Sequence, residues 1–474
     1  MIHDNELALA KAHSASQRFF EDAKMSDALV DKYGDARLPR YTSYPTAPAF
    51  SDAVGWQEYS NGLAGLRGTG PASLYLHVPF CRSMCWYCGC HTTITKQDAP
   101  ILDYLEVMTK EIGMVSSAAG NNLPVKNVHF GGGTPTIMKP HEFKALMMAL
   151  TNSFAFENDC TVAVEIDPRT LTSEMILALG ENGVNRASLG VQSFDPVVQK
   201  AINRIQTFGQ TQAAIVGLRA HGVTSTNFDL IYGLPHQTVQ SCVDTVRLAV
   251  ELRPERFAVF GYAHVPAFKK HQRLIDESAL PDARQRNEQA EAIASELVSA
   301  GYVRVGLDHF ALPDDQLAVA SASGMLHRNF QGYTTDDCDT LTGFGASAIG
   351  RLPAGFFQNH VAIGRYAEMV SSGVLPTAKG YVLTAEDKLR AAIIERLMCD
   401  FEADVGALSD RAGYDPRLLL ERNDRLDALV SDGVATVDGS RVLVSKNSRF
   451  MVRAVAAAFD AYFGSLGRTH SKAA

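Results

Sequence analysis

Six short apolar runs that alternate with helix-like segments constrain the fold of this chain more than any other feature of its sequence. Several runs are almost continuously apolar, as is typical of parallel strands covered on both faces. They are SLYLHVPF, VKNVHFGGG, CTVAVEIDP, RASLGVQSF, NFDLIYGLP and RFAVFGYAHV, which begin at residues 73, 125, 160, 186, 227 and 256. The intervening segments 100–115, 172–183, 210–222 and 239–252 carry apolar residues at i, i+3 and i+4, which predicts helices. This alternation predicts an α/β fold with a parallel sheet or a barrel.

The rest of the chain predicts an organisation in three consecutive parts. Residues 1–70 precede the first strand, contain the Pro- and Tyr-rich segment LPRYTSYPTAP, and predict an arm or cap. Residues 71–375 hold the alternating strands and helices, with one more strand expected over 302–313. Residues 376–474 predict a small, mostly helical domain.

The pattern of this last part is distinct from that of the alternating region. Apolar spacing predicts one helix over 385–398 and another over 415–433. The segment VATVDGSRVLVS that follows predicts a β-hairpin, because Asp438-Gly439 is a favoured two-residue turn.

The charge balance and hydropathy of the chain exclude two broad classes of protein. Lys plus Arg total 44 and Asp plus Glu total 52, and the formal net charge of −8 argues against a general binder of nucleic acid. No apolar run approaches the roughly 18 residues of a membrane span. Residues 1–16 lack the basic start and apolar stretch of a secretory signal. We therefore expect a cytoplasmic protein that binds no membrane, most simply a monomer.

Four of the eight cysteines lie within one short segment after the first strand. Cys81, Cys85, Cys88 and Cys90 have the spacing C-x3-C-x2-C-x-C. A disulfide framework would spread its cysteines and would need an oxidising compartment. Short loops of cysteine thiolates are typical ligands of iron–sulfur clusters. Three thiolates would leave one iron of a four-iron cluster open, which indicates catalysis rather than a structural role.

A structural zinc site is the main alternative for this loop. Such sites usually combine one C-x2–4-C pair with a second pair far along the chain, and no second pair exists here. His77 and His91 could complete a zinc shell, but both lie too near the loop to brace it well. The scattered cysteines, which are Cys160, Cys242, Cys338 and Cys399, are expected to be buried small apolar residues.

Polar residues and glycines stand where the predicted strands end. In α/β barrels the active groups gather at the C-terminal ends of the strands. The residues found there are Cys81, Gly131 to Thr134, Glu165, Gln192, Asp229 and Ala263. Glycines let a ligand approach the backbone closely, and the two acids could accept hydrogen bonds from hydroxyl or ammonium groups. Capping of the following helix is the alternative role for such acids, and it is the role we favour for Asp167.

The cysteine spacing resembles the signature of the radical S-adenosylmethionine (SAM) superfamily. The longer pattern is similar to the family of oxygen-independent coproporphyrinogen III oxidases of haem biosynthesis. The matching segments run in order from residue 39 to about residue 350: PRYTSYPTA, YLHVPFCRSMCWYCGC, FGGGTPT, NFDLIYGLP, GYAHVP, LDHFALPDDQLAVA, HRNFQGYTT and GFGASAIG. The resemblance implies a partial (β/α)6-type parallel barrel of the radical SAM kind, with the N-terminal arm over the substrate site and a small helical C-terminal domain.

The resemblance also implies a reaction. In that family three cysteines bind a [4Fe–4S] cluster, and S-adenosylmethionine chelates the open iron through its amino and carboxylate groups. Reductive cleavage gives methionine and a 5′-deoxyadenosyl radical, which removes a hydrogen from the β-carbon of a propionate. Loss of carbon dioxide and one electron leaves a vinyl group, and two such events convert coproporphyrinogen III into protoporphyrinogen IX. A reductant protein such as flavodoxin or ferredoxin would supply electrons.

Site residues are implied where this sequence matches the family. Cys81, Cys85 and Cys88 are implied as cluster ligands, whereas Cys90 matches an extra cysteine that is implied in catalysis and not in iron binding. Contacts to a first S-adenosylmethionine are implied for Tyr75, Gly132, Glu165 and Ile349. Contacts to a second molecule are implied for Tyr87, Gly133, Thr134, Gln192, Arg204, Asp229 and Ala263. Tyr87 stands where the family often has Phe, so its hydroxyl needs a partner. Without the resemblance, Arg204 would be interpreted as a solvated helix charge.

A substrate with four carboxylates requires a local basic cavity in this net acidic protein. Arg37 and Arg40 in the arm, and the segment KKHQR from residue 269, are candidates, although a solvated face is the favoured interpretation of KKHQR. Tyr41 and Tyr44, beside Arg40, could line the tetrapyrrole site or simply anchor the arm.

Three other functions stay open at the level of the sequence. A haem-binding chaperone of the same superfamily shares the cysteine loop, but such relatives generally lack the fourth cysteine and the long arm. An anaerobic haem-degrading methyltransferase is another branch, and the continuous match at HRNFQGYTT argues against it. A zinc-bound binding module is the third alternative, and it does not depend on the resemblance. Metal analysis together with visible absorption would distinguish a zinc protein from an iron–sulfur protein.

Overall fold

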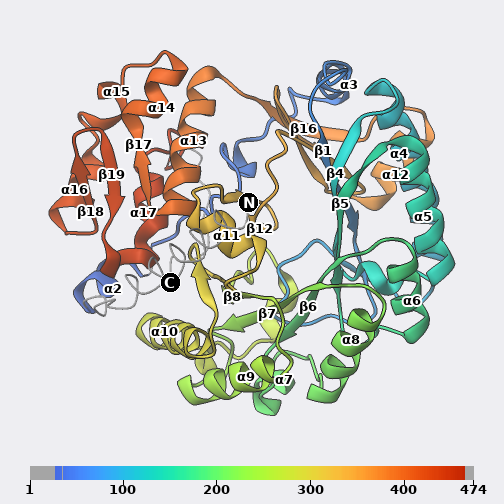
Figure 1. Ribbon diagram of the computed structural model, residues 1–474, viewed down its shortest axis with the longest axis horizontal. Helices are drawn as coiled ribbons and strands as arrows, with labels where there is room; N and C mark the ends of the chain where they lie inside the picture. Colours follow the sequence, from blue (N-terminus) through green and yellow to red (C-terminus); the bar gives the residue numbers. More distant parts are fainter. Residues whose placement is uncertain (1–26, 35, 465–474) are drawn as a thin grey trace. The chain divides into compact units, whose positions relative to one another are not determined.

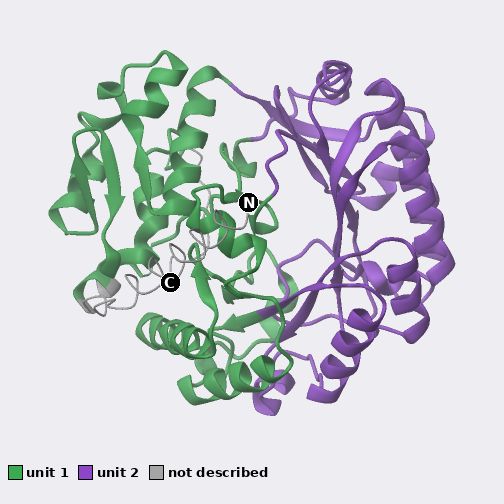
Figure 2. Cartoon of the chain, in the orientation of Figure 1, with its two compact units in different colours: residues 1–49, 230–335, 384–474 green, residues 50–229, 336–383 purple. Residues whose placement is uncertain are grey.

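The chain forms two compact units, which Figure 2 shows in different colours. The computed structural model describes residues 27–34 and 36–464. Unit 2 comprises residues 50–229 and 336–383, and unit 1 comprises the described residues up to 49, residues 230–335 and those from 384 onward. Unit 1 thus combines both described ends of the chain with residues 230–335. The three consecutive parts expected from the sequence stay a prediction.

Unit 2 is built on a sheet whose central strands are parallel. Across this sheet the strands are β16 (Thr377–Val382), β15 (Gly355–Asn359), β14 (Ile349–Leu352), β13 (Thr340–Phe344), β1 (Ala72–Val78), β4 (Pro124–Gly132), β5 (Ala155–Ile166) and β6 (Arg186–Gln192). β1 pairs in parallel with both β13 and β4, and the pairs β4–β5 and β5–β6 are also parallel. β7 (Ser225–Tyr232) follows β6 and carries the chain into unit 1. The mixed α/β fold with a parallel central sheet is therefore confirmed.

Helices α4, α5 and α6 lie along the outer side of these strands (Figure 1). The helices of unit 2 are α3 (Trp56–Ala64), α4 (Ala99–Ala118), α5 (Pro140–Ser153), α6 (Ser173–Glu181), α7 (Pro196–Ala201), α8 (Phe208–Ala220) and α12 (Ile363–Ser371). The hydroxyls of Thr172 and Thr207 cap α6 and α8 by accepting from backbone N–H groups of the first turn. The three helices predicted from apolar spacing in this region are confirmed.

A buried carboxylate fixes the loop that precedes β14. Glu111 on α4 is fully buried. It accepts hydrogen bonds from the Gly345 N–H (2.8 Å), the Asn359 side-chain amide (2.7 Å) and the Tyr366 hydroxyl (2.7 Å). Burial raises the pKa of Glu111 to about 7, although these three hydrogen bonds oppose the shift. Because the loop leads directly into Ile349, the contact positions one of the predicted ligand-binding residues.

Unit 1 contains the C-terminal helices and the last strands of the alternating region. Its elements are α2 (Asp27–Tyr33), α9 (Val239–Glu251), β8 (Arg256–Gly261), α10 (Ala283–Ser299), β9 (Val303–Val305), β10 (His309–Ala311), α11 (Gln316–Ala322), β11 (His327–Asn329), β12 (Gly332–Thr334), α13 (Ala385–Asp400), β17 (Glu402–Asp404), α14 (Val405–Ala412), α15 (Arg417–Leu420), α16 (Asp424–Ser431), β18 (Ala435–Asp438), β19 (Arg441–Val444) and α17 (Val452–Ala457). The predicted helices at 239–252 and 385–398 and the hairpin at Asp438-Gly439 are confirmed.

The described part of the arm up to residue 49 belongs to unit 1, whereas residues 50–70 belong to unit 2. Tyr41 and Tyr44 are each only 4 % exposed and pack with the buried residues of the C-terminal helices. The Tyr41 hydroxyl donates to Asp460 at 3.0 Å, and the Tyr44 hydroxyl accepts from the Ala461 N–H at 3.1 Å. These contacts support the interpretation of both rings as anchors of the arm rather than as walls of a tetrapyrrole site.

Two predicted elements are wrong in detail. The single strand expected over 302–313 is the antiparallel pair β9 and β10, because the chain reverses at Gly306, whose φ is +57°. The single helix expected over 415–433 is divided into α15 and α16, because Arg422 has a φ of +57° and Asn423 then caps a new helix. In both cases the apolar spacing is continuous while the backbone changes direction.

The predictions for the scattered cysteines, for membrane-spanning segments and for a secretory signal have different outcomes. Three of the scattered cysteines, Cys242, Cys338 and Cys399, are buried as predicted, and Cys160 is half-buried. In the described part of the chain, every helix is too short or too polar to cross a membrane. The expected lack of a secretory signal concerns residues 1–16, which lie outside the described residues.

Candidate active site at the strand ends of unit 2

The cysteine loop is closed at the end of β1. Directly after β1, the short strand β2 (Phe80–Cys81) pairs in parallel with β3 (Thr93–Ile94), so the two ends of the loop lie side by side. Between them the Trp86 N–H donates to the Ile202 carbonyl at 2.9 Å, which ties the loop to the end of α7. The loop is thereby held at the C-terminal edge of the parallel strands, where the fold concentrates functional residues.

Hydrogen-bond donors surround the sulfurs of the three predicted ligands. The Cys81 sulfur lies 3.4 Å from the Thr134 hydroxyl. The Cys85 sulfur accepts from the guanidinium groups of Arg169 at 3.4 Å and Arg204 at 3.6 Å. The Cys88 sulfur accepts from the Cys90 backbone N–H at 3.4 Å. Such donors stabilise thiolates and influence the reduction potential of an iron–sulfur cluster.

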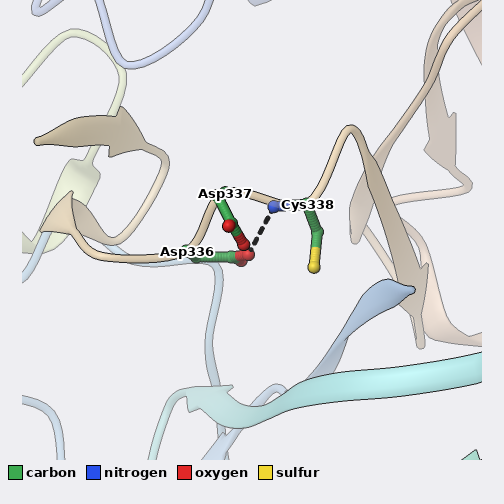
Figure 3. Close-up of side chains that lie close together, drawn as sticks. All are labelled: Asp336, Asp337 and Cys338. Atoms are coloured by element: carbon green, nitrogen blue, oxygen red, sulfur yellow. Dashed lines mark hydrogen bonds between the residues drawn. The ribbon is translucent and has the colours of Figure 1, made fainter. Parts of the chain in front are cut away.

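The spacing of the sulfurs does not fit a single metal ion. Sulfurs that share one tetrahedral zinc ion lie about 3.8 Å apart, given a zinc–sulfur bond of about 2.3 Å. Among the described residues, one group has ligand atoms that all lie within 4.8 Å of one another, and it comprises Asp336, Asp337 and Cys338 (Figure 3) rather than the loop cysteines. A four-iron cluster places each thiolate on a different iron and needs wider spacing, so the loop fits a cluster better than zinc.

The group in Figure 3 is a structural junction rather than a metal centre. Asp336 accepts from the Ser73 hydroxyl at 2.6 Å and from the Asn127 amide at 3.0 Å, and Asp337 pairs with Lys126 at 2.7 Å. Burial raises the pKa of the Cys338 thiol to about 11, so this thiol is neutral among its protein neighbours. The group also lies at the start of β13, at the opposite end of the parallel strands from the cysteine loop.

The glycine run at the end of β4, Gly131 to Gly133, brings its backbone against the cysteine loop. A Cβ atom at Gly133 would lie 2.6 Å from the Phe80 carbonyl oxygen, and Gly132 has a φ of +115°. The N–H groups of Gly133 and Thr134 donate to Val78 and Phe80 at 2.9 and 2.8 Å. Side chains on residues 132 and 133 would therefore push the end of β4 away from the loop, whereas the approach of a ligand to these glycines stays a prediction.

Glu165 forms a second cluster of contacts beside this loop. Its carboxylate accepts from the Gly132 N–H at 3.0 Å and lies 3.2 Å from the His129 imidazole. The His129 ring in turn stacks on the Tyr75 ring with centroids 5.9 Å apart. Burial raises the pKa of Glu165, but the hydrogen bond and charge of His129 and the Gly132 N–H outweigh burial and hold it below its usual value. Glu165 is therefore an anion at neutral pH.

Asp229 on β7 has a raised pKa, in contrast to Glu165. It accepts from the Ser188 hydroxyl at 3.0 Å and from the Asn227 amide at 2.8 Å. Desolvation, followed by the negative charge of Glu165, raises the pKa of Asp229 to about 7 in spite of these hydrogen bonds. Two acids in one region thus differ in charge near neutral pH, which is typical of a functional site.

Asp167 corrects one prediction, and Arg204 departs from the interpretation that it would have without the resemblance. Asp167 does not cap α6, whose cap is Thr172; instead it pairs with Arg169 at 2.6 Å and Arg204 at 3.3 Å. Arg204 is not a solvated helix charge, because it is 6 % exposed and donates to the Gly190 carbonyl at 2.6 Å. In the sequence, the position of Asp167 two residues before Arg169 was the one signal for the ion pairs among Asp167, Arg169 and Arg204.

Two buried polar atoms at the end of β6 have no hydrogen-bond partner. They are the Gln192 side-chain oxygen and the Arg204 Nε. Buried polar groups are normally paired, and an exception often marks the position of a ligand. Since Arg204 also contacts the Cys85 sulfur, the donor set fits a polar cofactor bound beside a cluster.

Most of the predicted site residues lie together in unit 2. Contacts join Cys81 to Thr134, Cys85 to Arg204, and Glu165 to Gly132. Tyr75, Tyr87, Gln192, Asp229 and Ile349 also belong to unit 2, whereas Ala263 follows β8 in unit 1 and lines a cavity there. Residues that the sequence did not suggest are His129, Arg169, Ser188 and Asn227.

Comparison with known proteins agrees with this arrangement. The family model described as the radical SAM superfamily matches residues 75–249, which include the cysteine loop, Glu165 and Asp229. An oxygen-independent coproporphyrinogen III oxidase of Bradyrhizobium diazoefficiens is 57% identical over 445 residues, which cover 94% of this chain and 99% of the relative. One of Pseudomonas aeruginosa is 39% identical over 444 residues, covering 93% of this chain and 96% of the relative.

A solved structure of a coproporphyrinogen III oxidase is also similar to this chain. Coproporphyrinogen III oxidase (HemN) from Escherichia coli, described as a radical SAM enzyme, matches with a TM-score of 0.87 and 35% identity and covers 94% of this chain and 100% of that chain. The fold and the cysteine loop thus define a radical SAM enzyme, which binds a [4Fe–4S] cluster and S-adenosylmethionine. Within that superfamily, the chain belongs to the family of oxygen-independent coproporphyrinogen III oxidases. The resemblance stated from the sequence is confirmed.

Proposed function

We propose that this chain catalyses the anaerobic oxidative decarboxylation of two propionates of coproporphyrinogen III to vinyl groups, giving protoporphyrinogen IX in haem biosynthesis. The observation that carries the proposal is the three-cysteine loop beside Glu165 and Asp229 in a chain 57% identical, over 94% of its length, to an oxygen-independent coproporphyrinogen III oxidase. A haem-binding chaperone is the weaker alternative, because such relatives generally lack the fourth cysteine, and Cys90 is present here.

The protein's own residues position the cofactors. Cys81, Cys85 and Cys88 hold the cluster, and the bound cluster with S-adenosylmethionine supplies the radical chemistry. Arg169 and Arg204 donate hydrogen bonds to the Cys85 sulfur and so fix its position in the loop. The glycine run at the end of β4 keeps the strand end packed closely against the start of the loop.

Two groups of residues bind two molecules of S-adenosylmethionine in this proposal. Contacts to the first molecule come from Tyr75, Gly132, Glu165 and Ile349. Contacts to the second come from Tyr87, Gly133, Thr134, Gln192, Arg204 and Asp229, all in unit 2, and the contact implied for Ala263 in unit 1 stays a prediction from the resemblance. The ionised Glu165 accepts hydrogen bonds from ribose hydroxyls or the ammonium group, and the unpaired Gln192 oxygen accepts one further donor.

The state of Asp229 makes cofactor binding depend on pH. With a pKa of about 7, Asp229 is mostly protonated at pH 6 and mostly ionised at pH 8, and the cationic cofactor favours the ionised form. We expect the Kd of S-adenosylmethionine to be about tenfold higher at pH 6 than at pH 8, because one proton must be released on binding. Equilibrium dialysis against the loaded protein measures this difference.

The matched variants are Asp229→Asn and, as a control, Asp103→Asn at an exposed position of α4. Titration of the cofactor's own amino group affects all three proteins equally and cancels in the comparison. A pH dependence that is the same in Asp229→Asn as in the unaltered protein would remove Asp229 from the binding site.

The partners and location of the protein are also proposals. The substrate is coproporphyrinogen III, and a reductant protein such as flavodoxin or ferredoxin supplies electrons. The protein acts in the cytoplasm as a monomer and binds neither nucleic acid nor membrane, in keeping with its net charge of −8.

The direct test is anaerobic turnover. The reconstituted protein is given a reductant, S-adenosylmethionine and coproporphyrinogen III, and the products are identified by mass. Loss of two carboxyl groups with formation of 5′-deoxyadenosine is the expected result. A loaded cluster without decarboxylation, together with tight haem binding, would instead favour the chaperone function.

A further inference from the structure

Unit 1 contains a cavity of about 260 Å³. One lining residue, Ala263, is a predicted cofactor contact, but none of the charged lining residues has a role in the cofactor site. Its charged lining consists of Arg40, Arg286, Arg304, Arg328, Arg453 and Asp308. These residues come from the arm, from α10, from β9 to β11 and from α17, and all of them belong to unit 1. We call this site the arginine cavity.

The arginine cavity is strongly positive in a protein with a net charge of −8. Five arginines and one aspartate line it, a local balance of +4. Burial raises the pKa of Asp308, but the charge of Arg328, a hydrogen bond with His309 at 2.7 Å and the charge of Arg40 hold it at about 2, so Asp308 is an anion. Like charges brought together out of water repel one another, and an anionic ligand relieves that repulsion.

Two of the arginines have hydrogen-bonding capacity that the protein leaves unused. The Arg328 side chain is 5 % exposed, and its Nε and Nη1 have no hydrogen-bond partner; the carboxylate of Asp308 is 3.9 Å away. The Arg304 Nε is also buried without a hydrogen-bond partner, while its Nη1 lies 3.7 Å from the Glu291 carboxylate. A buried unpaired guanidinium N–H is costly unless a ligand accepts from it.

Aromatic rings hold these guanidinium groups in place. The Arg328 guanidinium lies 4.4 Å from the centre of the Tyr333 ring, and that of Arg304 lies 5.3 Å from the centre of the Phe450 ring. Phe260, Phe310 and Phe330 add apolar surface to the lining. The cavity therefore combines guanidinium groups in fixed positions, which can bind carboxylates, with apolar walls. This lining suits a largely hydrocarbon ligand that carries carboxylate side chains.

We propose that the arginine cavity binds propionate carboxylates of the tetrapyrrole substrate, with Arg304 and Arg328 as the principal donors. The inference rests on the proposed function and names the residues that recognise its substrate. The cavity is smaller than the roughly 300–1,000 Å³ of sites that enclose a whole drug-sized ligand, so it holds side arms and not the whole macrocycle. Arg40, one of the two arm candidates from the sequence, lines it, and Arg37 is not among its lining residues.

The test uses the full-length protein and binding rather than turnover. Fluorescence titration gives the Kd of coproporphyrin III, a stable oxidised form of the substrate, and of its tetramethyl ester, which lacks the charges. The variants are Arg328→Gln and Arg304→Gln. The matched control is Arg247→Gln, an exposed arginine of α9 that pairs with Glu296.

We expect Arg328→Gln and Arg304→Gln each to weaken binding of the acid at least tenfold and to leave binding of the ester unchanged. The control binds both ligands like the unaltered protein. The KM for coproporphyrinogen III rises to a similar extent, while cluster absorption and the affinity for S-adenosylmethionine stay the same. If Arg328→Gln does not fold, Arg304→Gln and the comparison of acid with ester on the unaltered protein decide the question.

Three outcomes would overturn the inference. They are unchanged binding of the acid by both folded variants, loss of affinity for S-adenosylmethionine in place of the porphyrin, and displacement of the acid by an equal concentration of inorganic phosphate. Failure of the proposed function looks different, because the unaltered protein would then bind the acid through these arginines without decarboxylating coproporphyrinogen III.

Discussion

Replacing Cys85 with serine is expected to remove the iron–sulfur cluster and all measurable turnover. Cys85 is buried, and its sulfur accepts from two guanidinium groups. A serine hydroxyl at this position stays protonated and binds iron far more weakly than a thiolate does. The loss is measured as iron and sulfide content, visible absorption and protoporphyrinogen IX formation after anaerobic reconstitution.

The same exchange at Cys90 separates ligation from catalysis. Cys90 is exposed, and its backbone N–H supports the Cys88 sulfur, a contact that serine preserves. We expect Cys90→Ser to keep the iron content and absorption while turnover falls about tenfold or more, the scale of a lost acid–base or positioning group. Cys160→Ser, at a half-buried position of β5, is the control that changes neither property. Loss of the cluster in Cys90→Ser would make Cys90 a ligand, and retention of iron in Cys85→Ser would remove Cys85 from the ligand set.

The strands and the cysteine loop could be predicted because their signals are local. Each of the six apolar runs is long enough to show a buried strand by itself, and β1 and β4 to β8 all form. The loop follows from four cysteines in one segment. Turns inside continuous apolar patterns could not be predicted in the same way, because the reversals at Gly306 and Arg422 depend on backbone conformations that spacing does not encode.

The polar networks could not be predicted because their members are distant in the sequence. Arg204 reaches the Cys85 sulfur across 119 positions of the chain. The arginine cavity gathers side chains from residue 40 to residue 453, and no local run of basic residues marks it. The one local run considered, KKHQR, supplies no lining residue. Charge spacing in the sequence is therefore a poor guide to a basic site when the fold assembles it from single residues.

The two kinds of site show why a net acidic chain can act on an acidic substrate. The acids Glu165 and Asp229 in unit 2 favour a cationic cofactor, and the arginines in unit 1 favour an anionic ligand. Net charge is the sum of these opposing regions and of the solvated surface, so it does not describe either site. Variants of the arginines in unit 1 and of the two acids in unit 2 should accordingly affect substrate affinity and cofactor affinity separately.

Replacing Gly133 with alanine is expected to lower turnover at least a hundredfold. A Cβ atom there would lie 2.6 Å from the Phe80 carbonyl oxygen and 2.9 Å from the Phe80 backbone nitrogen, and backbone atoms in a paired strand cannot move aside easily. The end of β4 must then shift away from the loop, which weakens the contact of Thr134 with the Cys81 sulfur. Displacements of about 1 Å in such a site can reduce rates about a hundredfold.

The matched control is Gly113→Ala on α4, where an added Cβ atom meets nothing within 4 Å. Alanine in a helix interior stabilises by about 0.5–1 kcal/mol relative to glycine, so this variant should keep full activity and unfold at the same or a slightly higher temperature. Gly133→Ala should lose about 1–3 kcal/mol of stability through overpacking and still fold. Cofactor affinity, cluster absorption and turnover are measured on both variants. Full turnover in Gly133→Ala would mean that β4 does not need to approach the cysteine loop this closely.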